Sequence, residues 1–269
     1  MGTSKRIIIV GGGHNGLVAA AYLARAGFDL QVLERRELVG GAAVTEEWFP
    51  GYKVSSCAFS CYLLQRKVIE DLELRKHGFH VYAMKRGRFM PFPNGKSLTL
   101  GSNAKENTEQ IAQVSHRDAK SYPHWMSFWN RACSILHEHF LSPPPTLTEL
   151  FNKARDLGEQ DILETLLTVP LRDLLEQYFE SEEMRAFACS QIDGGDITAP
   201  GSAYASAYFH LGGFRNDPEN SGLVRGGMGT VTMAMARSAE AHGASIRTGA
   251  EVARILSQGG EVTGVELVD

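Results

Sequence analysis

Short apolar runs separated by glycines open the chain and predict a strand, a helix and a second strand. Residues 6–10 are apolar and β-branched after the first position, which is typical of a strand buried on both faces of a parallel sheet. Residues 15–26 are rich in Ala and Leu and precede Gly27, which predicts a helix that ends at a left-handed glycine. With a second strand over residues 30–34, the three elements make a right-handed βαβ unit.

The middle of the chain carries a different pattern. Between residues 53 and 100, short apolar stretches between turn signals predict strands and loops. Residues 104–213 are mainly helical in pattern. There, Ser115 with Asp118 resembles a capping box that opens a helix toward Leu141.

Two further signals divide this helical region. Ser181 is placed to cap a helix over residues 182–192. Three prolines at residues 143–145 cannot continue a helix, so we expect a stiff connector there.

The last fifty residues return to an α/β pattern. Glycines at residues 226–229 open an Ala- and Met-rich helix that runs to His242. Two strands, over residues 250–257 and 261–268, are joined by a glycine turn as a hairpin. Because the second strand runs to the end of the chain with no element after it, we expect a chain truncated at its C-terminus.

These patterns predict an α/β fold whose principal domain is discontinuous. A Rossmann-like domain is assembled from residues 1–50 and residues 223–269. Residues 51–222, strands first and helices afterwards, form a largely helical insertion between the two segments.

Composition narrows the classes of function. The 269 residues carry 27 basic and 31 acidic side chains, so no overall positive field attracts nucleic acid. No apolar run approaches the length of a transmembrane helix. Four cysteines do not suggest a disulfide framework, and no presequence is visible. We expect an intracellular protein of the cytoplasm or the mitochondrial matrix.

Glycines of the first turn match the spacing of a dinucleotide-binding loop, Gly11-x-Gly13-x-x-Gly16. Gly11 permits the tight turn, Gly13 lets a pyrophosphate approach the backbone, and Gly16 lets the helix pack close to the sheet. The helix then directs its free N–H groups at the phosphates. The loop residues expected to bind the cofactor are Gly11, Gly12, Gly13, His14, Asn15 and Gly16.

An acidic residue lies where such a fold binds ribose. Glu34 ends the second strand, 21 positions after Gly13, and its carboxylate can accept hydrogen bonds from both hydroxyls of an adenosine ribose. The same charge repels a 2′-phosphate, which disfavours NADP. Its neighbour Arg35 is included in the expected cofactor site.

A second glycine pair favours FAD over NAD. Gly40 and Gly41, followed by Ala42, come just after the acidic residue, and an NAD site needs no such element. A long flavin dinucleotide requires backbone without Cβ atoms beside its pyrophosphate and ribityl chain. Beside a dinucleotide-binding loop, this pair predicts FAD, with Gly40, Gly41 and Ala42 near it.

The block VGGGHNGLVAAAYLARAG, followed by LERRELVGGAAVTEE, resembles the phytoene-desaturase-type branch of the FAD-dependent amine-oxidase superfamily. Further similar stretches are DLELRKHGFHVY, YFESEEMRA, APGSAY and RGGMGTVTMAMARSAEAHGASI. The resemblance implies an FAD domain in separated segments, residues 1–50 and 223–269, and a substrate or cap domain over residues 51–222. It also implies that the chain re-enters the FAD domain near Gly229 and that backbone near Val252 brackets the adenine.

The sequence departs from the family in two places. Many relatives have Arg directly after the glycine pair, where this chain has Ala42, so any contact of that Arg with the cofactor is absent. Nothing corresponds to the C-terminal glycine-rich segment that contacts the isoalloxazine ring in the family.

Three other groups of residues have side chains that could take part in chemistry. Cys57 and Cys61 invite a disulfide-reductase interpretation, but two small buried residues are the more ordinary one. Cys133, His137 and His139 have helical spacing that could bind zinc, yet no second ligand pair lies nearby, so no metal is expected. His14 could orient the flavin or have no role, and both remain open.

The function expected is an FAD-dependent oxidoreductase that moves a hydride from a small apolar or amine substrate to flavin. No catalytic side chain is identified. The alternative is a non-catalytic protein that keeps the nucleotide-binding fold and acts through partners, with FAD structural or lost. A pyridine-nucleotide enzyme is a third alternative. Protein partners and substrate stay unknown from sequence, and neither nucleic acid nor a transmembrane segment is expected.

Overall fold

The structure is a computed structural model that describes residues 6–82, 87–190, 195–214 and 219–268. The described residues form two compact units. Unit 1 comprises those of residues 1–83 and 218–269, and unit 2 comprises those of residues 84–217. Each unit is described separately below.

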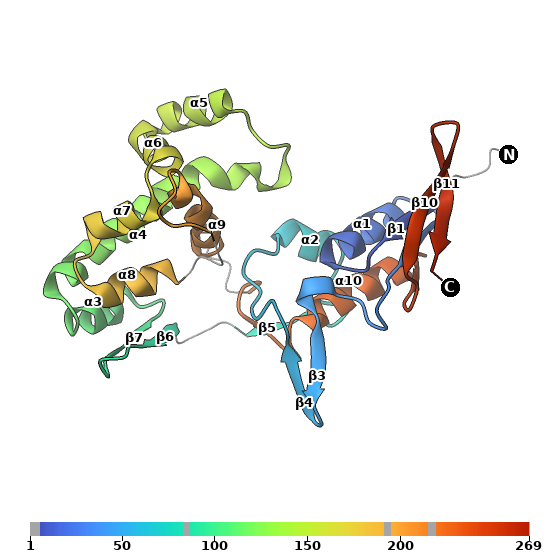
Figure 1. Ribbon diagram of the computed structural model, residues 1–269, viewed down its shortest axis with the longest axis horizontal. Helices are drawn as coiled ribbons and strands as arrows, with labels where there is room; N and C mark the ends of the chain where they lie inside the picture. The colour runs from blue at the N-terminus through green and yellow to red at the C-terminus, as the bar shows by residue number, and fades with distance from the viewer. Residues whose placement is uncertain (1–5, 83–86, 191–194, 215–218, 269) are drawn as a thin grey trace. The chain divides into compact units, whose positions relative to one another are not determined.

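Unit 1 contains strands, two long helices and short connecting elements (Figure 1). Its elements are β1 (Ile7–Val10), α1 (His14–Arg25), β2 (Leu30–Leu33), η1 (Gly41–Ala43), β3 (Thr45–Phe49), β4 (Tyr52–Ser55), α2 (Arg66–Asp71), β5 (Val81–Tyr82), β8 (Leu223–Val224), α10 (Gly229–Ala241), β9 (Ser245–Arg247), β10 (Val252–Gln258) and β11 (Glu261–Leu267). The predicted βαβ unit and the predicted C-terminal helix and hairpin are therefore confirmed, with ends shifted by up to three residues.

The parallel sheet of unit 1 has the strand order β1-β2-β9. Ile7 is paired with Leu30, and Gln31 is paired with Ser245, so segments distant in sequence meet in one sheet. Parallel pairing was expected of β1, but burial on both faces is wrong: its residues are half-buried and Val10 is 55% exposed. Among the described strands, β1 lies at one edge of the sheet rather than in its middle.

Helices α1 and α10 pack side by side in unit 1 (Figure 1). Small residues dominate their buried faces, including Ala20, Ala21 and Ala24 on α1 and Ala234 on α10. Side chains of this size let two helix backbones approach closely. Gly27 follows α1 with φ +87°, the left-handed conformation predicted for it.

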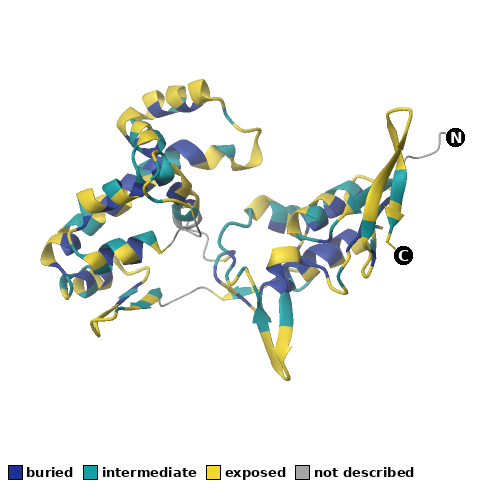
Figure 2. Cartoon of the chain, viewed as in Figure 1, coloured by how far each residue is buried: buried dark blue, intermediate teal, exposed yellow. Residues whose placement is uncertain are grey.

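Two hairpins extend from unit 1. Strands β10 and β11 pair antiparallel around Gly259 and Gly260, both with positive φ, and most of their residues are exposed (Figure 2). Strands β3 and β4 form the other hairpin, which the sequence did not single out. The hairpin begins at Thr45, close to the second glycine pair, Gly40 and Gly41, and therefore adjoins the site described below.

Unit 2 is mainly helical. Its elements are β6 (Arg88–Pro91), β7 (Ser97–Leu100), α3 (Ala104–Ala112), α4 (His116–Leu136), η2 (His137–Leu141), α5 (Leu147–Leu157), α6 (Gln160–Thr168), α7 (Leu171–Tyr178), α8 (Glu182–Cys189) and α9 (Ser202–Phe214). Large aromatic side chains, among them Trp125 and Trp129, fill its core, and the long helix α4 supplies several of them. The three prolines lie between η2 and α5, as the connector prediction requires.

The predicted helix caps in unit 2 are confirmed, with one correction. Ser115 Oγ accepts a hydrogen bond from Asp118 N at 3.1 Å, and Ser181 Oγ accepts one from Met184 N at 3.3 Å. The reciprocal half of the capping box is wrong, because Asp118 instead accepts from the backbone N–H groups of Glu180 and Ser181, at 2.8 and 3.0 Å. The buried carboxylate therefore joins the starts of two helices.

The two helices that these caps open end earlier than predicted. The first is α-helical to Leu136 and then tightens into a 3₁₀ turn that reaches Leu141. The second ends at Cys189, and its predicted last residue, Ile192, lies outside the described residues.

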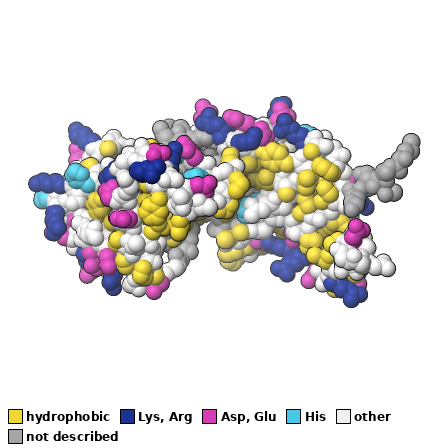
Figure 3. Space-filling model, turned by 90° about the horizontal axis from the view of Figure 1, so that it is seen from above, with side chains coloured by type: hydrophobic (Ala, Val, Ile, Leu, Met, Phe, Trp, Pro, Cys, Tyr) yellow, Lys and Arg dark blue, Asp and Glu magenta, His cyan; other side chains and the backbone are white. Residues whose placement is uncertain are grey.

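Residues 51–82, which we assigned to the insertion, cluster within unit 1 by their contacts. The boundaries after residues 50 and 222 remain a prediction about the domains of the family. Among the described residues, no helix combines the length and the apolar character needed to cross a membrane. On the face drawn in Figure 3, basic and acidic side chains lie interspersed.

Candidate functional site: a glycine-lined nucleotide cradle

The loop between β1 and α1 contains the predicted glycine motif. Gly11 has φ +101°, a conformation that favours glycine, and its amide donates to the Leu33 carbonyl at 2.8 Å. Gly13 is the N-cap residue of α1 and has no side chain with which to cap the helix. The first amides of α1, at His14, Asn15 and Gly16, therefore receive no hydrogen bond acceptor from the side chain of the N-cap residue.

The glycines of this loop fall into two kinds. A Cβ on Gly16 would lie 2.3 Å from the Gly11 carbonyl oxygen, and one on Gly12 would lie 3.0 Å from a Val39 methyl group. These two glycines are therefore needed for the packing of the chain itself. A Cβ on Gly11 would meet nothing within 4 Å, and one on Gly13 would meet only the Gly41 Cα, at 3.9 Å. The open space at Gly11 and Gly13 is where a ligand could approach the backbone.

Glu34 lies directly beneath this loop and is 7% exposed. Its Oε2 accepts a hydrogen bond from Gly12 N at 2.7 Å, and its Oε1 accepts one from Arg36 N at 2.9 Å. A carboxylate has about four acceptor positions, so both oxygens keep capacity for hydroxyl donors. The carboxylate holds the loop and can still receive the hydroxyls of a ribose.

A cavity of about 230 Å³ opens beside Glu34. It brings together four residues that the sequence predicted for the cofactor site: Gly11, Glu34, Arg35 and Val252. Its remaining lining residues were not predicted: Val10, Leu33, Ala250 and Glu251.

The geometry of the sheet explains this meeting. The carboxyl ends of the parallel strands β1 and β2 lie at one edge, where open α/β sheets bind ligands. The chain after β9 passes the same edge, because Ala250 N donates to the Glu34 carbonyl at 2.9 Å. The strand β9 that leads there spans three residues, too few for a pattern to reveal it.

The second glycine pair lies against the first loop. Gly40 N donates to the Gly12 carbonyl at 2.8 Å, and Gly13 and Gly40 form an isolated parallel bridge. A Cβ on Gly41 would lie 3.1 Å from the Gly13 Cα. Two backbone segments thus run side by side without side chains between them. Ala42 is exposed within the following turn, η1.

Gly229, which the resemblance placed near the cofactor, is the first residue of α10. Its amide donates to Thr45 Oγ1 at 2.9 Å, and a Cβ there would lie 2.7 Å from the Thr45 amide nitrogen. The contacts of Gly229 are thus to the chain itself, and its predicted contact with the cofactor remains a prediction.

The cysteine constellations are not arranged for chemistry. All four cysteines are free thiols; Cys61 is buried as expected, but Cys57 is exposed, so its expected burial is wrong. Burial raises the pKa of Cys61 to about 11 and that of Cys133 to about 12, so both thiols remain protonated near neutral pH. His137 Nδ1 lies 3.2 Å from the Cys133 carbonyl oxygen. In the described part of the chain, no group of His, Cys, Asp and Glu could hold a metal ion.

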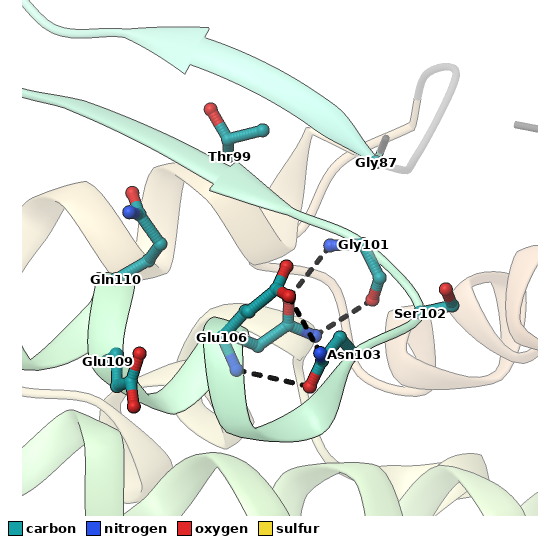
Figure 4. A pocket seen from close by; sticks show the side chains of 9 residues that line it. Gly87, Thr99, Gly101, Ser102, Asn103, Glu106, Glu109 and Gln110 are labelled. Carbon is teal, nitrogen blue, oxygen red and sulfur yellow. Dashed lines mark hydrogen bonds between the residues drawn. The ribbon is translucent and has the colours of Figure 1, made fainter. Parts of the chain in front are cut away.

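A larger cavity, of about 410 Å³, lies in unit 2 between β7 and the start of α3 (Figure 4). Three of its polar side chains, Asn103, Glu106 and Asn107, bond to one another or to nearby backbone. Asn103 Nδ2 donates to Glu106 at 2.7 Å, and Asn107 bonds to both the amide and the carbonyl of Gly101, each at 2.8 Å. This cavity shares no residue with the predicted cofactor site.

Comparison with known proteins agrees with this geometry. The model of a family described as flavin containing amine oxidoreductase matches residues 16–269. The chain belongs to this family. Family membership identifies the cofactor as FAD, and the residues of the cradle fit that group because open space at Gly11 and Gly13 adjoins the buried Glu34 carboxylate.

The matched relatives extend beyond this chain. The pyridine nucleotide-disulfide oxidoreductase domain-containing protein 2 of Rattus norvegicus is 36% identical over 97% of this chain and 50% of its own. The hydroxyneurosporene desaturase of Cereibacter sphaeroides is 28% identical over 98% of this chain and 53% of its own. The chain therefore spans about half the length of the curated relatives it matches.

A solved structure supports the fold class. A redesigned putrescine oxidase superposes with a TM-score of 0.62 and 22% identity, covering 98% of this chain and 54% of its own. The expected α/β, Rossmann-like fold class is confirmed.

Proposed function

We propose that unit 1 holds the adenosine and pyrophosphate of FAD in the glycine-lined cradle. Glu34 accepts hydrogen bonds from the ribose, and backbone at Val252 borders the adenine. The amides of Gly13 and of the first turn of α1, at His14, Asn15 and Gly16, face the pyrophosphate. Gly12 holds the Glu34 carboxylate through its own amide. Gly40, Gly41 and Ala42 run beside its other end, and Gly229 supports them. The observation that carries this proposal is the buried Glu34 carboxylate beside open space at Gly11.

We further propose that the protein is an FAD-dependent oxidoreductase that acts on a small apolar or amine substrate. The flavin, when bound, supplies the capacity to accept a hydride from a C–H bond. The residues of unit 1 bind and orient that cofactor. Family membership and the named relatives, a desaturase among them, support this activity over a non-catalytic role.

Replacing Glu34 with Ala tests the ribose contact. A hydrogen bond to a charged group contributes about 1.5–3 kcal/mol, so we expect FAD affinity to fall by about ten- to a hundredfold. Glu251 lines the same cavity but is exposed, which makes Glu251→Ala a matched control that should change affinity little. Titration of the purified chain with FAD, followed by flavin fluorescence, measures both. Equal affinity of Glu34→Ala and the unmodified chain would contradict the proposed ribose contact.

A further inference from the structure

The glycine pair of the cradle is held by hydroxyl groups of residues that were not predicted to bind the cofactor. Behind Gly40 and Gly41 lies the first turn of α10. Thr232 of that helix is fully buried, and its hydroxyl lies 3.1 Å from the Ala43 carbonyl, to which it donates, and 3.1 Å from the Gly229 carbonyl. A Cβ on Gly40 would lie 2.9 Å from the same hydroxyl. The close approach of Thr232 is thus a reason for glycine at position 40 that is independent of any ligand.

The start of α10 is itself held by two hydroxyls from the β3–β4 hairpin. Thr45 Oγ1 accepts a hydrogen bond from Gly229 N at 2.9 Å, and Ser55 Oγ accepts one from Met228 N at 3.0 Å. The two hydroxyl oxygens are 3.3 Å apart. They cap the helix in the place of its own N-cap residue, Met228, whose side chain offers no oxygen.

Two further glycines make room for this cap. A Cβ on Gly227 would lie 2.4 Å from Thr45 Oγ1, and one on Gly229 would lie 2.7 Å from the Thr45 amide nitrogen. The absence of side chains at these glycines therefore lets the hydroxyls of Thr45 and Ser55 reach the amides at the start of α10. Because Thr45 directly follows Val44 and the turn η1, a cap on α10 is also an anchor for the glycine pair.

We propose that Thr45, Ser55 and Thr232 are positioning residues for FAD, which hold the Gly40–Gly41 backbone at its distance from Gly12 and Gly13 without contacting the cofactor. This inference rests on the proposed function of the cradle. Loss of the Thr45 hydroxyl leaves the buried amide of Gly229 without its acceptor, and the adjoining turn is then free to shift. A shift of the glycine pair would strain the hydrogen bond from Gly40 N to the Gly12 carbonyl and so displace the backbone that lines the cradle.

Thr45→Val removes the hydroxyl at nearly constant volume, and Thr45→Ser restores it. Ser238→Ala is a matched control, because Ser238 is fully buried on the same helix and its hydroxyl donates to the Leu72 carbonyl, away from the turn. We expect Thr45→Val to weaken FAD binding about tenfold. Thr45→Ser and Ser238→Ala should keep the affinity of the unmodified chain, and Ser55→Ala should weaken it by a smaller factor.

Two measurements separate this proposal from the proposed function. FAD titration gives the affinities, and amide hydrogen exchange of residues 40–45 in the FAD-free chain reports directly on the turn. Faster exchange in Thr45→Val but not in Ser238→Ala supports the anchoring role. Equal affinity of Thr45→Val and Ser238→Ala overturns the proposal, as does Thr45→Ser binding as weakly as Thr45→Val. If the unmodified chain takes up no FAD, the proposed function fails, and the exchange data alone decide whether the hydroxyls hold the turn.

Discussion

The helices of unit 1 pack through small side chains, whereas those of unit 2 pack through large aromatic ones. In unit 1, α1 and α10 meet through alanines, and the loops at their ends meet through glycines. In unit 2, Trp125 lies edge-to-face with Trp129 and with Phe179, at centroid distances of 5.2 and 5.4 Å. Backbone approaches backbone in the first case, and rings fill the space between helices in the second.

This difference affects how each unit tolerates change. Where backbones touch, as at Gly16, only the smallest side chain fits, so the sequence is narrowly constrained. A core of large side chains accepts volume-conserving replacements and keeps its fold. Unit 1 can therefore hold a cofactor on backbone atoms whose positions are fixed. In unit 2, the packing of the interior is set by the volumes of the side chains that fill it.

The largest expected effect is the loss of a core ring from unit 2. Trp129 is 1% exposed, packs edge-to-face against Phe128 at 5.1 Å and stacks on His210 at 4.1 Å. Trp129→Ala should lower the free energy of unfolding of unit 2 by about 3–5 kcal/mol. Urea unfolding with hydrogen exchange of unit 2 segments measures the loss.

Trp48 gives the matched control for that substitution. It lies on the β3–β4 hairpin of unit 1 and is 59% exposed, so Trp48→Ala should cost less than about 0.5 kcal/mol. Similar losses for the two substitutions would mean that ring burial does not distinguish these regions.

Two glycine substitutions in unit 1 come next, and they should separate fold from binding. A Cβ at Gly16 overlaps the Gly11 carbonyl, so Gly16→Ala should lower the free energy of unfolding by about 1–3 kcal/mol through overpacking. Gly13 has φ −72°, which other residues adopt freely, and its Cβ would enter open space. Gly13→Val should therefore lower stability less than Gly16→Ala does, by the cost of Val at an N-cap, and exclude FAD by steric overlap.

Thermal unfolding and FAD titration of both variants test this separation. Unaltered FAD affinity in Gly13→Val would show that the open space beside Gly13 is not where the dinucleotide passes. Unaltered stability in Gly16→Ala would show that α1 can move away from the loop at little cost.

The same contrast explains what the sequence could predict. The backbone-on-backbone contacts of unit 1 require glycine at fixed spacing, so the loop at Gly11–Gly16 and the pair at Gly40 were recognisable in advance. Their neighbour β9 was missed because Ser245–Arg247 is too short to show periodicity. The edge position of β1 was missed because its apolar sequence is also typical of an inner strand.

Side-chain partners were harder to predict than elements. Glu34 was identified by its spacing, but its hydrogen bond to Gly12 N depends on the loop folding back over it. Thr45 and Gly229 are 184 positions apart, and no local pattern links a hydroxyl to so distant an amide. In unit 2, Asp118 fitted a local capping motif, yet the fold directs its carboxylate to Glu180 and Ser181. Tertiary contacts decided each of these cases.

The smallest predicted effect is a pH dependence confined to unit 2. Burial, with a smaller contribution from the charge of Arg88, lowers the pKa of His210 to about 3. In the unfolded chain this histidine takes a proton near pH 6.5, while in the folded unit it stays neutral. Stability is therefore fully present above pH 6.5 and is lost as pH falls toward 3.

Between pH 7 and pH 5.5 this loss amounts to about 1 kcal/mol. His210→Phe keeps a ring against Trp129 and should flatten the dependence of the unfolding free energy on pH over that interval. His124, exposed on the same helix as Trp129, provides the control His124→Phe, which should keep the slope of the unmodified chain. Carboxylates that lose their charge at lower pH act equally in both variants, so the difference between the two slopes isolates His210. Identical slopes would mean that the folded unit admits a proton, or water, to this ring, and that the aromatic core is less closed than its packing indicates.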